Sequence, residues 1–313
     1  MPPEFSTRVG DEAAAVQAFV SRHGRVPRWS GSRAPRSGDL AGEPVRELWQ
    51  DESWRQIILT AQHAKCAFCE CRVDTHAWPL DHFAPKSRVD ELVSAGSETA
   101  TGAVHGRHLR GQHPVGYWYL AYVWTNYLAA CFNCSTRWKK TLFPTSPPAA
   151  PSPGGAARPL VLNPFCGPDP ELHLRFDQDG LIHPRSGSAY GFETIRVCGL
   201  DRTTLNGHRK RTAMSTDTAL DQVLQLALAR TGTIGWWLDW LRSLTAPDAL
   251  HAGTARSLVR DHLAAQLGAY RVAGAADVGG LLARAGVTGG VDSASWDQVW
   301  HVFYFVRAGQ WWK

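Results

Sequence analysis

The chain has 313 residues, 44% of them hydrophobic and 19% charged, which is the composition of a soluble globular protein with a sizeable core. No apolar run approaches the length that a membrane span needs, and the first residues lack the basic and apolar regions of a signal peptide. We therefore expect a cytoplasmic protein with reduced cysteines and no membrane partner, and the net charge of +5 permits a polyanionic partner without requiring one.

Helices are predicted at the start of the chain. Apolar residues recur at spacings of about 3.6 in residues 12–19 and 44–63, and a stretch rich in Gly, Ser, Arg and Pro around 28–44 separates the two segments. Further on, the polar insert 94–116 predicts a solvated loop. Its arginines and histidines offer contacts to a nucleic-acid backbone as the less favoured alternative.

Residues 144–159 are rich in Pro, Ala, Ser and Gly and predict a linker or a surface loop. The next segment alternates as strands do, and Asp179-Gly180 inside it is a hairpin-turn signal. From Leu200 onward the apolar spacing is helical. We expect an N-terminal helical segment, a cysteine-bearing core, the linker or loop, and a C-terminal region of strands and then helices, with the boundaries 1–58, 59–143, 144–159 and 160–313.

Two CxxC motifs carry the strongest chemical signal. They are Cys66-Ala-Phe-Cys69 and Cys131-Phe-Asn-Cys134. Two thiolates from each of two tight turns give the tetrahedral four-sulfur shell that structural zinc prefers. Such ligation contributes on the order of 10–16 kcal/mol in small zinc peptides, so it can hold together a fold with little core of its own. Four buried cysteines without a metal are the weaker hypothesis.

Between the two motifs, Asp81 and His82 place a carboxylate next to an imidazole. If this pair ends a β-strand, the two side chains point to opposite faces. Neither residue would mean much alone, because a buried histidine with a hydrogen-bond partner is common. Here Asn126 follows, five residues before Cys131. Basic side chains lie nearby in the sequence, at Lys86, Arg137, Lys139 and Lys140.

In this order of motifs the sequence resembles the HNH nucleases. Their pattern is a first CxxC, a D-H pair ending one strand, an Asn on the second strand and a second CxxC opening a helix. Here it reads CAFCE, LDHFAPKS, TNYLAACFNC and RWKK within about residues 60–143. The segments GYWYLAYVWTN, VLNPFCGPDPELHLRFDQDGLI and GFETIRVCGLDRTTL extend the resemblance to the HNH nuclease subunits of Septu-type and retron-linked anti-phage systems.

The resemblance implies an α+β fold, with a zinc-stapled ββα-metal core, helices before it and a mainly helical C-terminal region. It also implies a metal-dependent endonuclease acting on DNA. His82 matches the general base, Asp81 the oxygen ligand of a catalytic Mg²⁺ or Mn²⁺, and Asn126 the residue that orients the base. The implied phosphate contacts are Lys86, Arg137, Lys139 and Lys140. The implied ligands of the structural zinc are Cys66, Cys69, Cys131 and Cys134.

One position departs from the HNH pattern. Ser135 stands directly after the last cysteine, where the family usually has His or Asn as the second ligand of the catalytic metal. A hydroxyl is a weaker ligand, so either Ser135 binds through water or Asn133 or His108 supplies the contact. The departure keeps open a catalytically degenerate zinc-knuckle module that binds nucleic acid or protein. An HNH nuclease acting on RNA is a third hypothesis.

The C-terminal third is rich in tryptophan, with Trp236, Trp237, Trp240, Trp296, Trp300, Trp311 and Trp312. A helical core is the first explanation, a protein-binding surface the second, and stacking on unpaired bases the third. The last two tryptophans favour a partner for that end of the chain. The resemblance implies that this partner is an ATPase of the ABC or SMC-like class. A homo-oligomer stays open, because one active site cuts one strand.

Overall fold

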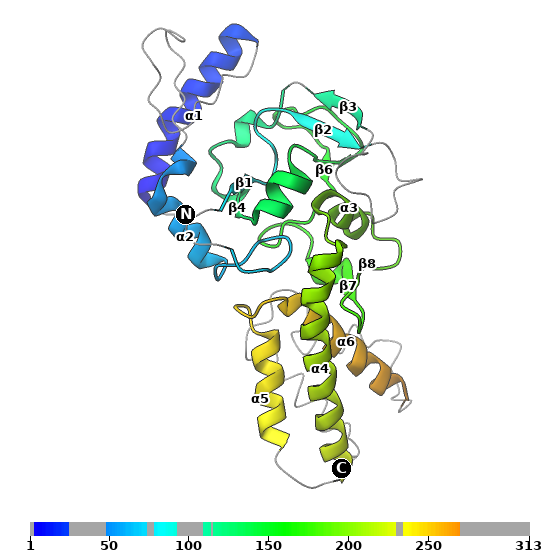
Figure 1. Ribbon diagram of the computed structural model, residues 1–313. Coiled ribbons are helices and arrows are strands. Elements are labelled where there is room, and N and C mark those ends of the chain that lie inside the picture. Colours follow the sequence, from blue (N-terminus) through cyan, green and yellow to red (C-terminus); the bar gives the residue numbers. More distant parts are fainter. Residues whose placement is uncertain are drawn as a thin grey trace, which may run out of the picture. The chain divides into compact units, whose positions relative to one another are not determined.

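The computed structural model describes residues 3–24, 48–73, 78–92, 109–113, 115–229 and 234–269. The chain divides into two compact units (Figure 1). Unit 1 comprises Met1–Pro168 and Ala189–Leu200, and unit 2 comprises Asp169–Ser188 and Asp201–Lys313. Both units combine helices with short antiparallel strands, so the α+β class expected from the sequence is confirmed.

Unit 1 is built from short elements around the cysteine motifs. Its α-helices are α1 (Pro3–His23), α2 (Glu52–Ala61) and α3 (Ala189–Cys198). It also has three 3₁₀ turns, η1 (Leu48–Gln50), η2 (Trp118–Leu120) and η3 (Trp124–Asn126), and one π-helix, η4 (Asn133–Lys139). Its strands pair as β1 (Leu80–His82) with β4 (Tyr127–Ala129), β2 (Val89–Leu92) with β3 (Leu109–His113), and β5 (Thr145–Ser146) with β6 (Arg158–Pro159). All three pairs are antiparallel.

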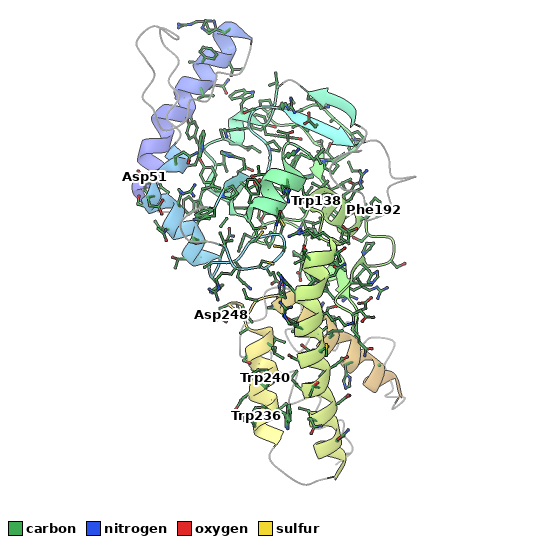
Figure 2. All side chains as sticks on the ribbon, viewed as in Figure 1. Asp51, Trp138, Phe192, Trp236, Trp240 and Asp248 are labelled. Atoms are coloured by element: carbon green, nitrogen blue, oxygen red, sulfur yellow. The ribbon has the colours of Figure 1, made fainter. Side chains whose placement is uncertain are left out.

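Helix α2 begins at a side-chain cap (Figure 2). Asp51 has extended backbone angles, and its carboxylate accepts a hydrogen bond from the Ser53 N–H at 3.0 Å. Trp54, Ile58 and Leu59 follow at helical spacing and are buried. The helix therefore packs by the apolar stripe that the sequence predicts.

Strands β1 and β4 bring together segments that lie far apart in the sequence. Their register pairs His82 with Tyr127. The side-chain amide of Gln62, just after α2, binds both backbone groups of Ala129 in β4. Its Nε2 donates to the carbonyl oxygen at 2.9 Å, and its Oε1 accepts from the N–H at 2.9 Å. These two bonds fix the end of α2 against the strand that leads into the second CxxC motif.

The π-helix η4 follows β4 and packs against α3. Gly199, directly after α3, has a φ of 57°, and a Cβ added there would lie 1.9 Å from the Trp138 ring, so only glycine fits. The Lys140 N–H donates to the Ser135 carbonyl oxygen at 2.7 Å, which is the wide turn of a π-helix. Ser135 and Lys139 lie one such turn apart and face the same strand, as described below.

Unit 2 is mainly helical. Its elements are η5 (Pro170–Leu172), β7 (Leu174–Phe176), β8 (Ile182–Pro184), α4 (Thr203–Ala229), α5 (Ile234–Thr245) and α6 (Ala252–Ala269). Gly180, with a φ of 75°, lies in the tight turn between β7 and β8, which confirms the predicted hairpin. The Phe176 N–H donates to Ser257 Oγ on α6 at 3.0 Å, and α4 packs against α5 and α6.

Two segments that were expected to lack regular structure contain short strands. Leu109–His113 was expected to belong to the loop of the insert, but it forms strand β3. The sequence does not predict this strand, because LRGQH has only one apolar residue and the strand is formed by pairing with β2. The ends of 144–159 pair as β5 and β6, and the whole segment lies within unit 1, as a loop of that unit does. The stretch around 28–44 and residues 93–108 lie outside the described residues.

Candidate active site and zinc centre

The four cysteines of the two CxxC motifs lie together. Their sulfur atoms are all within 4.8 Å of one another, and the sulfurs of Cys69 and Cys131 are 3.7 Å apart. A tetrahedral zinc with Zn–S bonds of about 2.3 Å has sulfur–sulfur edges of about 3.8 Å, so the cluster fits zinc. The group that could hold the ion is the one that the sequence predicts, Cys66, Cys69, Cys131 and Cys134.

The first CxxC motif is a tight turn attached to strand β4. The Glu70 N–H donates to the Cys66 carbonyl oxygen at 2.9 Å and closes the turn. The Ala67 N–H donates to the Ala129 carbonyl oxygen at 3.0 Å. Because Ala129 lies just before the second motif, these bonds place the two pairs of sulfurs side by side.

Asp81, in β1, is buried, and both oxygens of its carboxylate have partners on η4. Oδ1 accepts a hydrogen bond from the Ser135 hydroxyl at 2.8 Å, and Oδ2 is 2.9 Å from Lys139 Nζ. Lys139 is 0% exposed, and its ammonium also donates to the His82 carbonyl oxygen at 3.0 Å. The helix after the second CxxC motif is therefore bound to the Asp81-His82 pair by an ion pair and two hydrogen bonds.

The orientation of the His82 imidazole is set by a backbone carbonyl. Nε2 lies 3.2 Å from the Ala121 oxygen, which also accepts from the Tyr127 hydroxyl at 2.6 Å. A carbonyl only accepts, so Nε2 carries the proton and Nδ1 the lone pair. Burial lowers the pKa of His82 well below its ordinary value, and the charges of Lys86 and Lys139 lower that pKa further. A neutral imidazole with a lone pair on Nδ1 is the protonation state in which a general base accepts a proton.

Trp49, in η1, covers this imidazole. It is 2% exposed, and its ring meets the His82 ring edge to face with centroids 4.8 Å apart. The Lys86 ammonium lies 4.6 Å from the centre of the same tryptophan ring. His82 itself is 8% exposed. Trp49 therefore packs directly on the imidazole, which has little contact with solvent.

Asn126 ties two backbone segments together. Its Oδ1 accepts from the Ala84 N–H at 2.7 Å, and its Nδ2 donates to the Ala84 and Leu120 carbonyl oxygens at 3.1 and 3.0 Å. The amide is buried, so these bonds are sheltered from water. They fix the chain directly after His82 to the chain before β4. A role for Asn126 in orienting the base stays a prediction.

The predicted phosphate contacts separate into three groups. Arg137 and Lys140 are exposed on and after η4. Lys86 is half-buried against Trp49. Lys139 differs from expectation, because its ammonium lies inside the unit on Asp81 and does not reach a phosphate at the surface. The physical reason is that a buried carboxylate needs a counter-charge beside it.

The catalytic divalent ion predicted at Asp81 and Ser135 does not fit this arrangement as it stands. The two side chains do adjoin, as a ligand pair should. However, the Lys139 ammonium already balances the carboxylate, and it would repel a second cation on the same group. Of the alternative ligands, Asn133 is exposed and His108 lies outside the described residues.

Sequence reasoning misses Trp49 and the inward position of Lys139. Trp49 belongs to a segment predicted as helical, so its pattern indicates packing and nothing about His82. Lys139 carried a weak signal, because it follows Ser135 by four residues and so shares a helix face with the predicted ligand.

Among known proteins, the chain is similar to Septu protein PtuB of Bacillus mycoides (strain KBAB4). The two are 29% identical over 183 residues. The match covers 57% of this chain and 57% of the relative, which is less than two thirds of the relative's length. The similarity supports a relationship to the Septu defence systems. Comparison with protein-family models gives no match, and comparison with solved structures gives none either.

Two of the three tryptophans of α5 lie on the surface of unit 2. Trp236 and Trp240 stack with ring centroids 6.0 Å apart and are 59% and 41% exposed, so these two rings do not fill the helical core that was the first explanation (Figure 2). The other predicted aromatic positions, Trp296, Trp300, Trp311 and Trp312, lie outside the described residues. Among the described helices, none combines the length and the apolar character needed to span a membrane.

Proposed function

We propose that this chain is an HNH-type endonuclease that hydrolyses phosphodiester bonds in DNA. The observation that carries the proposal is the state of His82 at the end of β1. Its imidazole is neutral, its Nε2 is bound to the Ala121 carbonyl oxygen, and its Nδ1 keeps the lone pair that can accept a proton. The order of β1, β4 and η4 around the four cysteines supports the proposal, because it is the order that the resemblance implies.

In the proposed reaction, His82 Nδ1 takes a proton from water while the water oxygen attacks phosphorus. The 3′ oxygen leaves, and the product is a nick with a 5′ phosphate. Arg137 and Lys140, which are exposed, hold the phosphates that flank the cut. Dependence on Mg²⁺ or Mn²⁺ belongs to the proposal, because the resemblance implies it. One site cuts one strand, so cutting both strands takes two copies or two rounds.

We also propose that the nuclease is the effector of an anti-phage defence complex. The similarity to Septu protein PtuB supports this role. The partner that the motif resemblance implies is an ATPase of the ABC or SMC-like class. Co-purification of this chain with the product of a neighbouring ATPase gene tests the assembly, and separate elution of the two proteins would contradict it.

Nicking of supercoiled plasmid by the zinc-loaded chain tests the chemistry. The reaction is run with Mg²⁺, with Mn²⁺ and with a chelator of divalent ions added just before the DNA. Because Trp49 covers His82, the wild type and Trp49→Ala are assayed together. We expect nicking in at least one of them and its loss in His82→Ala. Cleavage of RNA in place of DNA would keep the mechanism and change the substrate.

A second candidate function is a zinc-knuckle module that binds nucleic acid or protein without chemistry. The specific observation in its favour is the Lys139 ammonium on Asp81, together with a hydroxyl at Ser135 where the family has a stronger ligand. DNA binding without cleavage in every metal, by the wild type and by Trp49→Ala, would favour this module over the nuclease.

A further inference from the structure

A fully buried ammonium lies against Asp81, and the proposed reaction gives it no task. Lys139 is 0% exposed, and its Nζ contacts Asp81 Oδ2 at 2.9 Å and the His82 carbonyl oxygen at 3.0 Å. Taking a charge out of water is costly unless an opposite charge lies beside it. The pair therefore neutralises itself in the interior of unit 1.

The same carboxylate is the predicted ligand of a divalent ion. Ser135 Oγ occupies one carboxylate oxygen and Lys139 Nζ the other, so both oxygens already have partners. A hard divalent cation needs the negative charge of that carboxylate. In a buried place, repulsion between the ammonium and the ion is only weakly screened. The two cations therefore exclude each other at Asp81.

Lys139 has the chemistry of a displaceable cation. An ammonium on a four-carbon stem is a compact point charge, and it lacks the rigid fork by which arginine holds a carboxylate. It is also the last residue of η4, and Lys140 leaves the helix with a φ of 47°. The chain thus changes direction next to the side chain that has to move.

We propose that Lys139 is an internal cation, which holds the Asp81 carboxylate when no divalent ion is bound, and that a divalent ion binds Asp81 only in exchange for it. This inference rests on the proposed function for the assignment of Asp81 as a metal ligand. Lys139 is a positioning residue in this account. It keeps Asp81 and His82 in place in the metal-free protein, and it weakens metal binding by the work of its own displacement.

Direct binding of Mn²⁺ to the zinc-loaded chain tests the competition, with free Mn²⁺ measured by electron paramagnetic resonance. Removing a competing charge should tighten binding, so we expect Lys139→Met and Lys139→Gln to bind Mn²⁺ at least about tenfold more tightly than the wild type. Lys139→Arg should bind no more tightly than the wild type, because a guanidinium fork holds the carboxylate more firmly. Asp81→Asn should lose this binding in every background.

A purely structural role for Lys139 gives the opposite result. Loss of a structural ion pair would leave Asp81 less well placed, and the two uncharged variants would bind Mn²⁺ equally or more weakly. That result overturns the proposal. So does a failure of the wild type and both uncharged variants to bind Mn²⁺ at a site that depends on Asp81.

Chemical labelling of the wild type keeps the test independent of any variant that fails to fold. Reductive methylation of lysines is followed by mass spectrometry with and without Mn²⁺. We expect Lys139 to be protected without Mn²⁺ and labelled with it, while the exposed Lys140 is labelled in both cases. Protection of Lys139 that Mn²⁺ leaves unchanged overturns the exchange. Exchange without any nuclease activity would support the internal cation and contradict the proposed function, so the two failures are distinguishable.

Discussion

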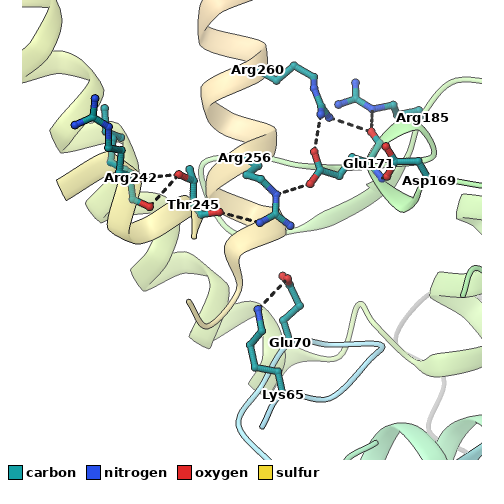
Figure 3. Close-up of polar contacts among 10 residues, drawn as sticks. Lys65, Glu70, Asp169, Glu171, Arg185, Arg242, Thr245, Arg256 and Arg260 are labelled. Atoms are coloured by element: carbon teal, nitrogen blue, oxygen red, sulfur yellow. Dashed lines mark hydrogen bonds and ion pairs between the residues drawn. The ribbon is translucent and has the colours of Figure 1, made fainter. Parts of the chain in front are cut away.

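Each unit surrounds a carboxylate with cations, and the two arrangements differ. In unit 1, Asp81 faces one ammonium, with Lys139 Nζ at 2.9 Å. In unit 2, Glu171 faces two guanidinium groups (Figure 3). Arg256 Nε binds one oxygen of Glu171, and Arg260 Nη2 binds the other at 2.5 Å.

The network in unit 2 also reaches the backbone. Arg260 donates to the Glu171 carbonyl oxygen at 3.1 Å, and Arg256 donates to the Thr245 carbonyl oxygen at 2.9 Å. It therefore joins η5 and the end of α5 to α6. A guanidinium group balances the charge of a carboxylate and also binds it in a fixed geometry, whereas an ammonium only balances the charge. The Glu171 network is therefore suited to a permanent structural link, and the Asp81 pair is suited to an exchange.

Zinc removal should produce the largest difference in stability between the two units. Unit 1 has short strands and brings the four cysteines together, so loss of a zinc interaction on the order of 10–16 kcal/mol should unfold it. Unit 2 has its own packed helices and should stay folded. Amide hydrogen exchange after chelation should show lost protection in β1, β4 and η4 and retained protection in α4 and α6.

Cys66→Ser should reproduce the effect of zinc removal. Cys166→Ser, at an exposed cysteine of the same unit, is the matched control and should leave exchange unchanged. If β1 and η4 kept their protection without zinc, the two units would not differ in their need for the metal. Unit 1 would then be held by its core alone.

Trp49→Ala tests whether Trp49 restricts access to His82 in unit 1. Truncating a buried tryptophan should lower the free energy of unfolding by about 3–5 kcal/mol. It should also open His82, so carbethoxylation of this imidazole by diethylpyrocarbonate, followed by mass spectrometry, should become several-fold faster than in the wild type. An unchanged rate at His82 in the folded variant would mean that Trp49 is core packing and does not restrict access.

Asn126→Ala tests whether side-chain hydrogen bonds hold the chain after His82 in unit 1. In unit 2, the arginines of α6 hold η5 in a comparable way. The change leaves the buried backbone groups of Ala84 without their amide partner. Each unsatisfied group costs about 1–3 kcal/mol, so the unfolding free energy from denaturant titration should fall by about 3 kcal/mol in total. Thr125→Ala, at an exposed neighbour, should change it little. Equal stability of the two variants would show that the loop has other support.

Glu171→Gln should give the smallest loss, about 2–3 kcal/mol, because the part-exposed arginines regain water when the carboxylate is removed. Burial alone would raise the pKa of Glu171, but Arg256 and Arg260 outweigh it and lower that pKa below its ordinary value. A lowered pKa stabilises the folded state above the ordinary value, and this stabilisation is lost as the pH falls through the lowered one. The free energy of unfolding of unit 2 should therefore fall less on acidification in the variant than in the wild type. An identical acid profile would contradict a structural role for this charge.

The parts of the site that sequence predicts are those that depend on short spacing. Two CxxC turns, a D-H pair and an Asn before the second turn each have a local signal, and the structure brings the four cysteines together and places Asp81 beside Ser135. The ion pair from Lys139 and the cover from Trp49 depend on how distant segments pack. Composition carries no record of such pairs, and periodicity gives only the weak signal that Lys139 follows Ser135 by four residues. The helices after Leu200 are predicted well because their apolar spacing is long and regular.

The decisive experiment compares plasmid nicking by His82→Ala and by His63→Asn, each made in the background, wild type or Trp49→Ala, that nicks plasmid. His63 is an exposed histidine of the same unit with a φ of 54°, which asparagine tolerates, so the control changes an imidazole without touching the site. Loss of a general base should slow nicking by about 10²–10⁴-fold in His82→Ala, while the control keeps the rate of its background. Equal rates for the two variants would contradict the claim that the imidazole at the end of β1 activates water.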